Sequence, residues 1–222
     1  MGLLKCVTLT LTLASASWGF VPTVNPSSSK TILQAAESEV SFGELDGSDV
    51  RIGIIRTRWN DEHVSNLVKG CKKALAECKV KEENIFETSV PGSYELPLAA
   101  RFLALSGTVD AIVCAGVLIK GETLHFEYIS EAVSSGIMSV QLQTQMPVVY
   151  GVLNCLNEDQ VKARSSGDNN HGYDWGKTAV EMALLRMEAL NIKAGTTDKL
   201  SALGFSKPTP LEVGKKPAPG FF

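Results

Sequence analysis

The sequence is poor in the residues that bind metal ions. It has 3 histidines among 222 residues, and its five cysteines form no C-x-x-C pair. No histidine lies at zinc-ligand spacing from a cysteine, so we expect no metal site. Cys114 falls in a fully apolar run, as a buried small hydrophobe does. We therefore expect reduced thiols and no disulfide framework.

Other signals are missing as well. The net charge is −3, which does not favour a general nucleic-acid binder. No run reaches the about 18 uninterrupted apolar residues of a membrane span, so we expect no membrane segment in the mature protein. No P-loop, G-x-G-x-x-G, G-x-S-x-G or Ser-His-Asp order occurs. Hydrophobic residues make up 44% of the chain and charged residues 20%, a globular balance that excludes wholesale disorder.

Acidic residues are missing from the N-terminal end up to Glu37. Lys5 precedes an apolar run over residues 6–13, and small residues follow, which is the order of a signal peptide. The Ser-rich, basic stretch beyond is typical of a transit peptide. The combination resembles the two-part leaders of proteins imported into complex plastids. We predict that residues 1–47 are a disordered targeting leader to the plastid; the alternative is a plain secretory signal and a loose linker.

The C-terminal end differs in composition from the middle of the chain. After about Ile192 the sequence is rich in glycine, proline and lysine, which is typical of a flexible tail. We therefore predict a tail over residues 192–222 and a single folded domain over residues 48–191, which is long enough to bury a core.

Apolar runs and amphipathic stretches alternate within this domain. The runs typical of buried strands are residues 51–55, 85–90, 110–119 and 147–153. The stretches with helical periodicity begin at residue 61 and then cover residues 93–105, 126–140, 157–164 and 175–190. The alternation predicts right-handed βαβ units. The expected fold is a three-layer α/β domain in which helices flank a four-stranded parallel sheet.

The last predicted helix is apolar on more than one face. Trp175, Ala179 and Met182 fall on one side of it, and Val180 and Leu184 fall on another. A helix that is apolar nearly all round must bury both sides, so we predict that the second side meets another subunit.

Candidate functional residues follow the predicted strands. In open α/β sheets the ligand lies at the carboxyl ends of the strands, so the loops there are informative. Trp59 in the first loop has a ring that could stack on a flat heterocycle. In the third loop, the N–H groups at a helix start and the Thr123 hydroxyl can hold a phosphate. His125 lies within reach of such a site and can move a proton near neutral pH.

Four segments of these loops resemble lumazine synthase, the riboflavin-pathway enzyme that makes 6,7-dimethyl-8-ribityllumazine. They are GIIRTRWN (53–60), PGSYELP (91–97), GVLIKGETLHFEY (116–128) and PVVYGVL (147–153). They stand at the ends of four successive predicted strands, and the likeness runs from about residue 51 to residue 187. The resemblance implies a flavodoxin-like fold and a transferase that needs no metal and no redox cofactor.

The resemblance also implies two substrates, 5-amino-6-(D-ribitylamino)uracil and 3,4-dihydroxy-2-butanone 4-phosphate. Trp59 matches the aromatic residue that stacks on the pyrimidine ring, and Tyr150 matches an aromatic residue that the neighbouring subunit contributes. His125 matches the proposed general acid/base. The segments that match those binding the ribityl chain and the ring edge contain Ser93, Tyr94, Glu95, Val117, Leu118 and Ile119.

The phosphate site is also implied by the resemblance. Glu122 and Thr123 match the phosphate-binding turn, and Arg164 matches the cation that clamps the phosphate. Glu122 departs from what a phosphate site favours, because its carboxylate repels an anion. We expect the backbone N–H to make that contact while the side chain points away.

The resemblance places the site between the subunits of a pentamer. The family's 60-subunit shells commonly have a Gly/Lys-rich loop after the clamping arginine. Here residues 165–172 read SSGDNNHG, with His171 in place of a lysine, which is similar to the fungal members that stop at pentamers. We therefore expect a homopentamer rather than a 60-subunit shell.

Two other functions are compatible with parts of this sequence. A non-catalytic lumazine- or flavin-binding shell protein would have the same fold, but it needs no proton-transfer residue such as His125 beside a phosphate turn. A flavodoxin-like FMN carrier is disfavoured because no Ser/Thr-rich phosphate loop follows Ile55. Taken singly, Trp59 could be a core or interface aromatic and Arg164 a helix-end cation.

Overall fold

A parallel sheet of four strands forms the centre of the domain in the computed structural model, which describes residues 41–192. The strand order is β2-β1-β3-β4, and every neighbouring pair is parallel. The strands are β1 (Ile52–Thr57), β2 (Ile85–Val90), β3 (Ala111–Ile119) and β4 (Val148–Cys155). Most of the predicted leader and all but the first residue of the predicted tail lie outside the described residues.

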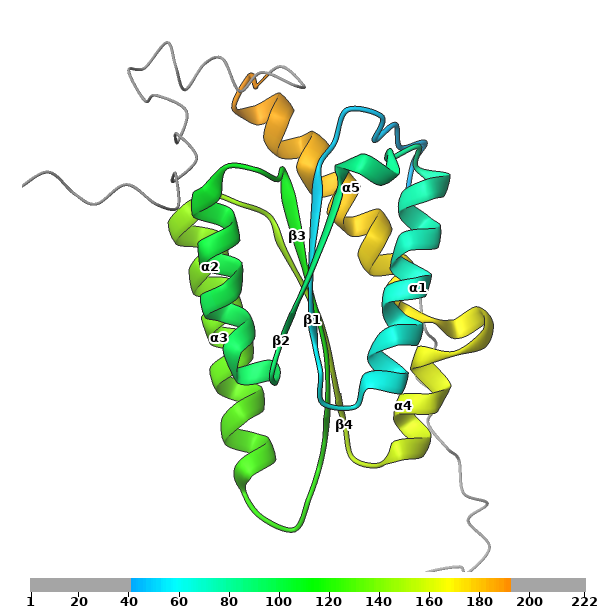
Figure 1. Cartoon of the computed structure of the whole chain (residues 1–222), viewed down its shortest axis with the longest axis vertical. Coiled ribbons are helices and arrows are strands. Elements are labelled where there is room, and N and C mark those ends of the chain that lie inside the picture. The colour runs from blue at the N-terminus through cyan, green and yellow to red at the C-terminus, as the bar shows by residue number, and fades with distance from the viewer. Residues whose placement is uncertain (1–40, 193–222) are drawn as a thin grey trace, which may run out of the picture. The chain divides into compact units, whose positions relative to one another are not determined.

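Helices cover both faces of the sheet (Figure 1). On one face lie α1 (Asp61–Glu77), α4 (Glu158–Ser165) and α5 (His171–Ala189), and on the other lie α2 (Leu96–Ser106) and α3 (His125–Thr144). Short 3-10 turns are η1 (Glu82–Asn84), η2 (Ser93–Glu95) and η3 (Gly167–Asn169). The predicted three-layer α/β fold is confirmed. Within residues 41–192, none of the helices combines the length and apolarity needed to cross a bilayer.

The sheet separates two apolar cores, because successive side chains of a strand point to opposite faces. Ile52 and Ile54 pack in the core that includes α1 and α5, whereas Ile55 packs in the core of α2 and α3. Strand β3 is buried from Ala111 to Val117, as predicted for a central strand. Strand β2 lies at the edge, and its middle residues are exposed.

Helix α5 begins at His171 rather than at Trp175, where the sequence pattern placed its start. The reason is a local cap: the Asn170 side chain accepts a hydrogen bond from the Gly172 N–H at 2.9 Å. The apolar pattern misses this first turn because glycine and polar residues fill it.

Helices α5 and α1 cross very closely. A Cβ atom on Gly172 would overlap the Leu67 carbonyl oxygen, and one on Gly176 would lie 2.6 Å from the Cys71 carbonyl oxygen. Only glycine fits these two positions without moving a backbone. This contact corrects the interpretation of the last helix. Its second apolar side packs on α1 of the same chain, so that side alone does not require another subunit.

The outer surfaces of α2 and α3 hold exposed apolar side chains instead. Their spacing of three or four residues places them in one stripe on each helix. The large apolar residues that are more than half exposed there are Leu98, Phe102, Leu105, Met138 and Leu142, besides Tyr128 near the start of α3. Contiguous exposed apolar surface of this kind marks an interaction site.

Candidate functional site

A hollow of about 660 Å³ lies where β1 and β3 end, a volume typical of small-molecule sites. Four separate chain segments form its walls, which contain no lysine and no arginine. The lining residues are Trp59, Asn60, Pro91, Gly92, Ser93, Tyr94, Glu95, Val117, Leu118, Ile119, His125 and Ile129. Most of the predicted site residues therefore gather here.

Strand β3 extends past its neighbour β1 at this hollow. The pairing of the two strands ends at Arg56 and Ala115, whereas β3 continues to Ile119, paired only with β4. The last four residues of β3 therefore have one edge without a partner strand. Backbone N–H and C=O groups there must find other partners.

Asn60 occupies part of this free edge. Its side-chain Nδ2 donates to the Val117 carbonyl oxygen at 3.0 Å. Asn60 itself has φ 58°, in the left-handed region, which asparagine tolerates better than most residues. Because the backbone groups of alternate residues point the same way, those of Ile119 face the same side as the Val117 carbonyl, toward the hollow.

Aromatic rings stand at the rim. Trp59 is 74% exposed and Tyr94 is 62% exposed, so both rings have faces available to a ligand. A Cβ atom on Gly92 would come within 3.3 Å of the Trp59 ring, so the glycine lets the ring lie against the turn before α2. The Glu95 carboxylate accepts the Gly92 N–H at 2.8 Å and thereby fixes that turn. Ser93 is buried in the wall.

His125 is the first residue of α3 and lines the hollow with an exposed side chain. Its N–H donates to the Thr123 hydroxyl at 3.4 Å. Thr123 and Glu122 are exposed in the loop before α3 and do not line the hollow. A phosphate held at this turn would meet the positive end of the α3 dipole.

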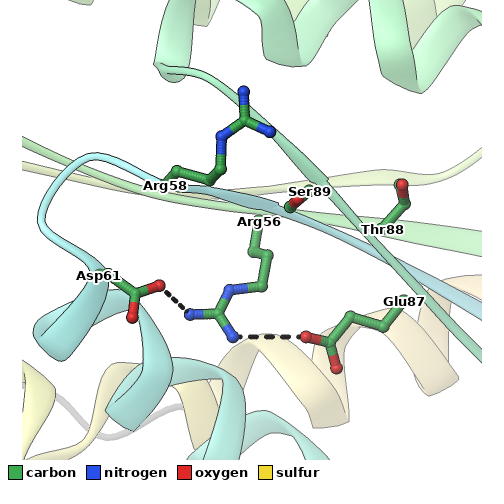
Figure 2. Close-up of a pocket in the computed structure, with 6 residues that line it drawn as sticks. All are labelled: Arg56, Arg58, Asp61, Glu87, Thr88 and Ser89. Atoms are coloured by element: carbon green, nitrogen blue, oxygen red, sulfur yellow. Dashed lines mark hydrogen bonds and ion pairs between the residues drawn. The ribbon is translucent and has the colours of Figure 1, made fainter.

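A second hollow, of about 570 Å³, lies beside β2 on the α1 side of the sheet. Figure 2 shows the Arg56 guanidinium between Asp61 and Glu87, with Nη–O distances of 2.6 and 3.4 Å, while Arg58 extends away from them. Lys72 also reaches Glu87, at 2.6 Å. Burial acts to raise the pKa of the Glu87 carboxyl, but Lys72 and Arg56 together outweigh it and lower that pKa. Arg56 already has two carboxylate partners, so its charge is largely balanced within this hollow.

Comparison with known proteins agrees with the site. A family model described as 6,7-dimethyl-8-ribityllumazine synthase matches residues 49–187. The chain belongs to this family. The match includes all four loops on which the resemblance to lumazine synthase was based, so that resemblance is confirmed.

Curated relatives bear the same family name. The 6,7-dimethyl-8-ribityllumazine synthase of Schizosaccharomyces pombe is 49% identical over 144 residues, covering 64% of this chain and 91% of the relative. The synthase of Pyricularia oryzae is 42% identical over 182 residues, with the same two coverages. The synthase of Clostridium kluyveri is 37% identical over 151 residues, covering 68% of this chain and 98% of the relative.

Besides Glu122 and Thr123, two more residues that the lumazine synthase resemblance singles out do not line the hollow of their own chain. Tyr150 lies on β4, half-buried, and its hydroxyl accepts a hydrogen bond from the Asn154 amide at 2.7 Å. Burial raises the pKa of this hydroxyl, and the hydrogen bond from Asn154 opposes the rise. Arg164 lies near the end of α4 and donates to the Gln160 carbonyl oxygen at 3.1 Å. Helix α4 is on the opposite face of the sheet from α3 (Figure 1).

Sequence reasoning did not select Asn60, Pro91, Gly92 and Ile129, which also line the hollow. Asn60 has a weak local signal, since asparagine adopts the left-handed conformation more readily than most residues. Its bond to Val117 has no such signal, because 57 residues separate the two. Ile129 lies one turn after His125 on α3, so helical spacing alone places it on the same side of the helix.

Proposed function

We propose that this chain is a lumazine synthase of riboflavin biosynthesis. It condenses 5-amino-6-(D-ribitylamino)uracil with 3,4-dihydroxy-2-butanone 4-phosphate to give 6,7-dimethyl-8-ribityllumazine, phosphate and water. The observation that supports this most is one hollow, in a chain of this family, lined by an exposed Trp59, an unpaired edge of β3 and His125. These features suit a flat, hydrogen-bonding heterocycle beside a proton-transfer group.

The pyrimidine is bound by its face and by its edge. Trp59 stacks on the ring, and the backbone groups of Val117 and Ile119 on the free edge of β3 pair with the ring edge, while Leu118 between them lines the wall. The segment from Ser93 to Glu95 binds the hydroxyls of the ribityl chain. Backbone groups are well suited to this task because they are fixed in place before the ligand arrives.

The chemistry requires proton transfers but no cofactor. The 5-amino group of the pyrimidine attacks the ketone, and loss of one water gives an imine. Phosphate then leaves, and ring closure with loss of a second water gives the lumazine. His125 moves protons to and from the reacting nitrogen and oxygen atoms. Much of the remaining rate comes from holding two substrates together in register.

The second substrate is bound across a subunit boundary. Its phosphate meets the turn of Glu122 and Thr123, where the Glu122 backbone N–H makes the contact. The walls of the hollow supply no lysine or arginine, so Arg164 of a neighbouring subunit clamps the phosphate. Tyr150 of that neighbour covers the ring. The assembly is a homopentamer, and the exposed apolar stripes of α2 and α3 contribute to its interfaces.

The place of action is a plastid. The support for it is the leader composition, in which an apolar run precedes an acid-free, Ser-rich stretch. Fusing residues 1–47 to a fluorescent protein in a plastid-bearing cell tests this. Fluorescence in the plastid supports the proposal, and fluorescence in the medium supports the secretory alternative.

The first experiment mixes the purified chain with both substrates and follows the absorbance of the lumazine against an enzyme-free control. Clear acceleration supports the synthase. An assembled protein that binds the pyrimidine without accelerating the reaction would instead be a binding shell, and Glu122 would be the first residue to replace.

His125 provides a sharper test. His125→Ala is expected to lower turnover by about 10²-fold or more while ring binding is kept, because general acid–base catalysis contributes about that much. His171→Ala is the matched control, since His171 starts α5 and lies outside the hollow. If ring binding falls while turnover per bound substrate holds, the acid/base role is wrong.

Mixing two inactive variants tests the shared site. If His125 and Arg164 act from neighbouring subunits, unfolding and reassembling His125→Ala with Arg164→Ala restores about one quarter of the sites. If both residues act from one chain, every site keeps a defect and no activity returns. Analytical ultracentrifugation of the unmodified chain distinguishes a pentamer from a 60-subunit shell.

A further inference from the structure

Helix α4, which carries Arg164, has little apolar surface with which to pack. It spans eight residues, and its buried residues are Val161 and Ser165. The burial of one apolar side chain stabilises a helix only modestly and does not fix how the helix is rotated. The orientation of α4, and with it the direction of Arg164, therefore depends on polar contacts.

His63 on α1 makes polar contacts with both ends of this helix. Its Nδ1 lies 3.2 Å from the Ser165 Oγ, and its Nε2 lies 3.8 Å from the Glu158 Oε1. Glu158 is the first residue of α4 and Ser165 is the last. The His63 side chain is only 12% exposed, so it is fixed between α1 and α4. Two attachment points along one short helix set its position and its rotation.

The two contacts differ in strength. Glu158 is 60% exposed and also pairs with Lys162 at 3.0 Å, so its interaction with His63 is shared and screened by solvent. Ser165 is fully buried, and a buried hydroxyl that loses its partner is costly. The bond between His63 and Ser165 is therefore the one that matters most for α4.

A further bond holds the end of α4 near Ser165. The Asn170 Nδ2 donates to the Asn66 carbonyl oxygen at 2.8 Å and to the Ser165 carbonyl oxygen at 3.3 Å. Arg164 directly precedes Ser165, so a shift of the Ser165 end displaces the guanidinium. His63 and Asn170 together hold this end of α4 against α1.

We propose that His63 is a positioning residue: through Ser165 it fixes the end of α4 and thereby aims Arg164 at the phosphate of the second substrate. This rests on the proposed function of Arg164. His63 does not touch either substrate in this role, since it lies under α4 and outside the hollow. Its loss should therefore affect one substrate and spare the other.

Steady-state kinetics of His63→Ala test the proposal. The KM for the butanone phosphate is expected to rise about tenfold, while the KM for the ribitylaminouracil changes less than about twofold. His63→Gln, which can still reach Ser165 with an amide, should recover most of the loss. Lys162→Ala is the matched control, because it removes the exposed partner of Glu158 on the same helix and should change neither KM.

A double-mutant cycle shows whether His63 acts through Arg164. In an Arg164→Ala background, His63→Ala should add nothing to the KM for the butanone phosphate, because the group that it positions is gone. Additive effects, or an equal rise of both KM values, overturn the proposal. If His63→Ala fails to assemble, Ser165→Ala replaces it with the same expected split. An inactive unmodified chain contradicts the proposed function. If the unmodified chain is active but His63→Ala does not affect the two KM values differently, only the role of His63 is contradicted.

Discussion

The two helical layers differ in how much of their apolar surface is buried within a single chain. On the side of α1, α4 and α5, the close crossing at Gly172 and Gly176 buries the apolar face of α5 against α1. On the side of α2 and α3, two stripes of large apolar residues remain exposed. The comparison shows that the second layer leaves more large apolar side chains exposed for a neighbour than the first, where Leu185 is the exposed one on α5.

The largest effect on stability is expected from Gly172→Ala, in the layer of α1, α4 and α5. The new methyl group would overlap the Leu67 carbonyl, and a backbone cannot rotate out of the way. We expect the free energy of unfolding to fall by about 3 kcal/mol, measured by urea denaturation.

Gly136→Ala on α3 is the matched control. Its methyl group would lie 2.8 Å from the Cγ atom of the Pro97 ring, whereas that on Gly172 would lie much closer to the Leu67 carbonyl oxygen. The overlap at Gly136 is less severe, so the loss should be smaller. Equal losses would contradict the claim that the two layers differ in how tightly their helices cross.

The next effect concerns assembly. Phe102→Glu puts a charge in the exposed stripe of α2, and we expect it to weaken association by about 2 kcal/mol per contact while each subunit stays folded. Sedimentation velocity measures the assembly, and circular dichroism measures the fold. Leu185→Glu, on the exposed surface of α5, serves as the comparison and should leave the assembly intact. The opposite result would assign the interface to α5.

A third test asks whether the core beneath α2 and α3 is as tight as the other one. Cys71 lies in the core of α1 and α5, and Cys114 lies in the core of α2 and α3. Burial raises the pKa of each thiol to about 12 from an ordinary value of 9.0. Both cores therefore keep a thiol protonated where the unfolded chain would ionise it.

The sign of the pH dependence follows from this. Between pH 9 and pH 12 the folded state holds a thiol proton that the unfolded state has lost, so stability falls as the pH rises. From pH 8 to pH 10, Cys71→Ala and Cys114→Ala should each lose about 1–2 kcal/mol less stability than the unmodified chain. Urea titrations at the two pH values measure it. If the stability difference between Cys114→Ala and the unmodified chain were the same at both pH values, while that of Cys71→Ala changed, the core of α2 and α3 would open more easily.

The smallest effect is expected on the outer surface of α2 and α3. Arg101 on α2 donates to the Gln143 side chain on α3 at 2.5 Å, in an exposed position. Arg101→Ala should change stability by about 0.5 kcal/mol or less, because water replaces such a bond easily. Thermal unfolding measures it. A loss above about 1 kcal/mol would show that polar ties, rather than apolar burial, hold these two helices together.

The fold was predictable because its signals are local. Apolar runs marked the four strands, and the helical stretch expected over residues 157–164 is α4, which Asn157 caps by accepting the Gln160 N–H at 3.0 Å. The start of α5 was missed because Asn170 and Gly172, rather than an apolar stripe, define it. Local patterns fail where a capping side chain decides the boundary.

The site was predictable in part. Trp59 and His125 follow predicted strands, and they meet in one hollow. Asn60 was missed because its role depends on a strand that runs past its neighbour, which no local pattern reveals. Tyr150 and Arg164 lie outside the hollow of their own chain, so their roles, like the pentamer and the plastid, remain predictions.

The extension of β3 past β1 has a consequence for how this protein could change its choice of substrate. Apart from proline, which lacks the N–H, every residue brings the same main-chain donor and acceptor whichever side chain is attached. Mutational drift at Leu118 or Ile119 therefore leaves the pattern of donors and acceptors along that edge unaltered. Laboratory evolution toward a different heterocycle would have to alter Trp59 or Asn60, or slide the strand by a residue. A ligand read by backbone is in this way protected against single-nucleotide changes in the residues that touch it.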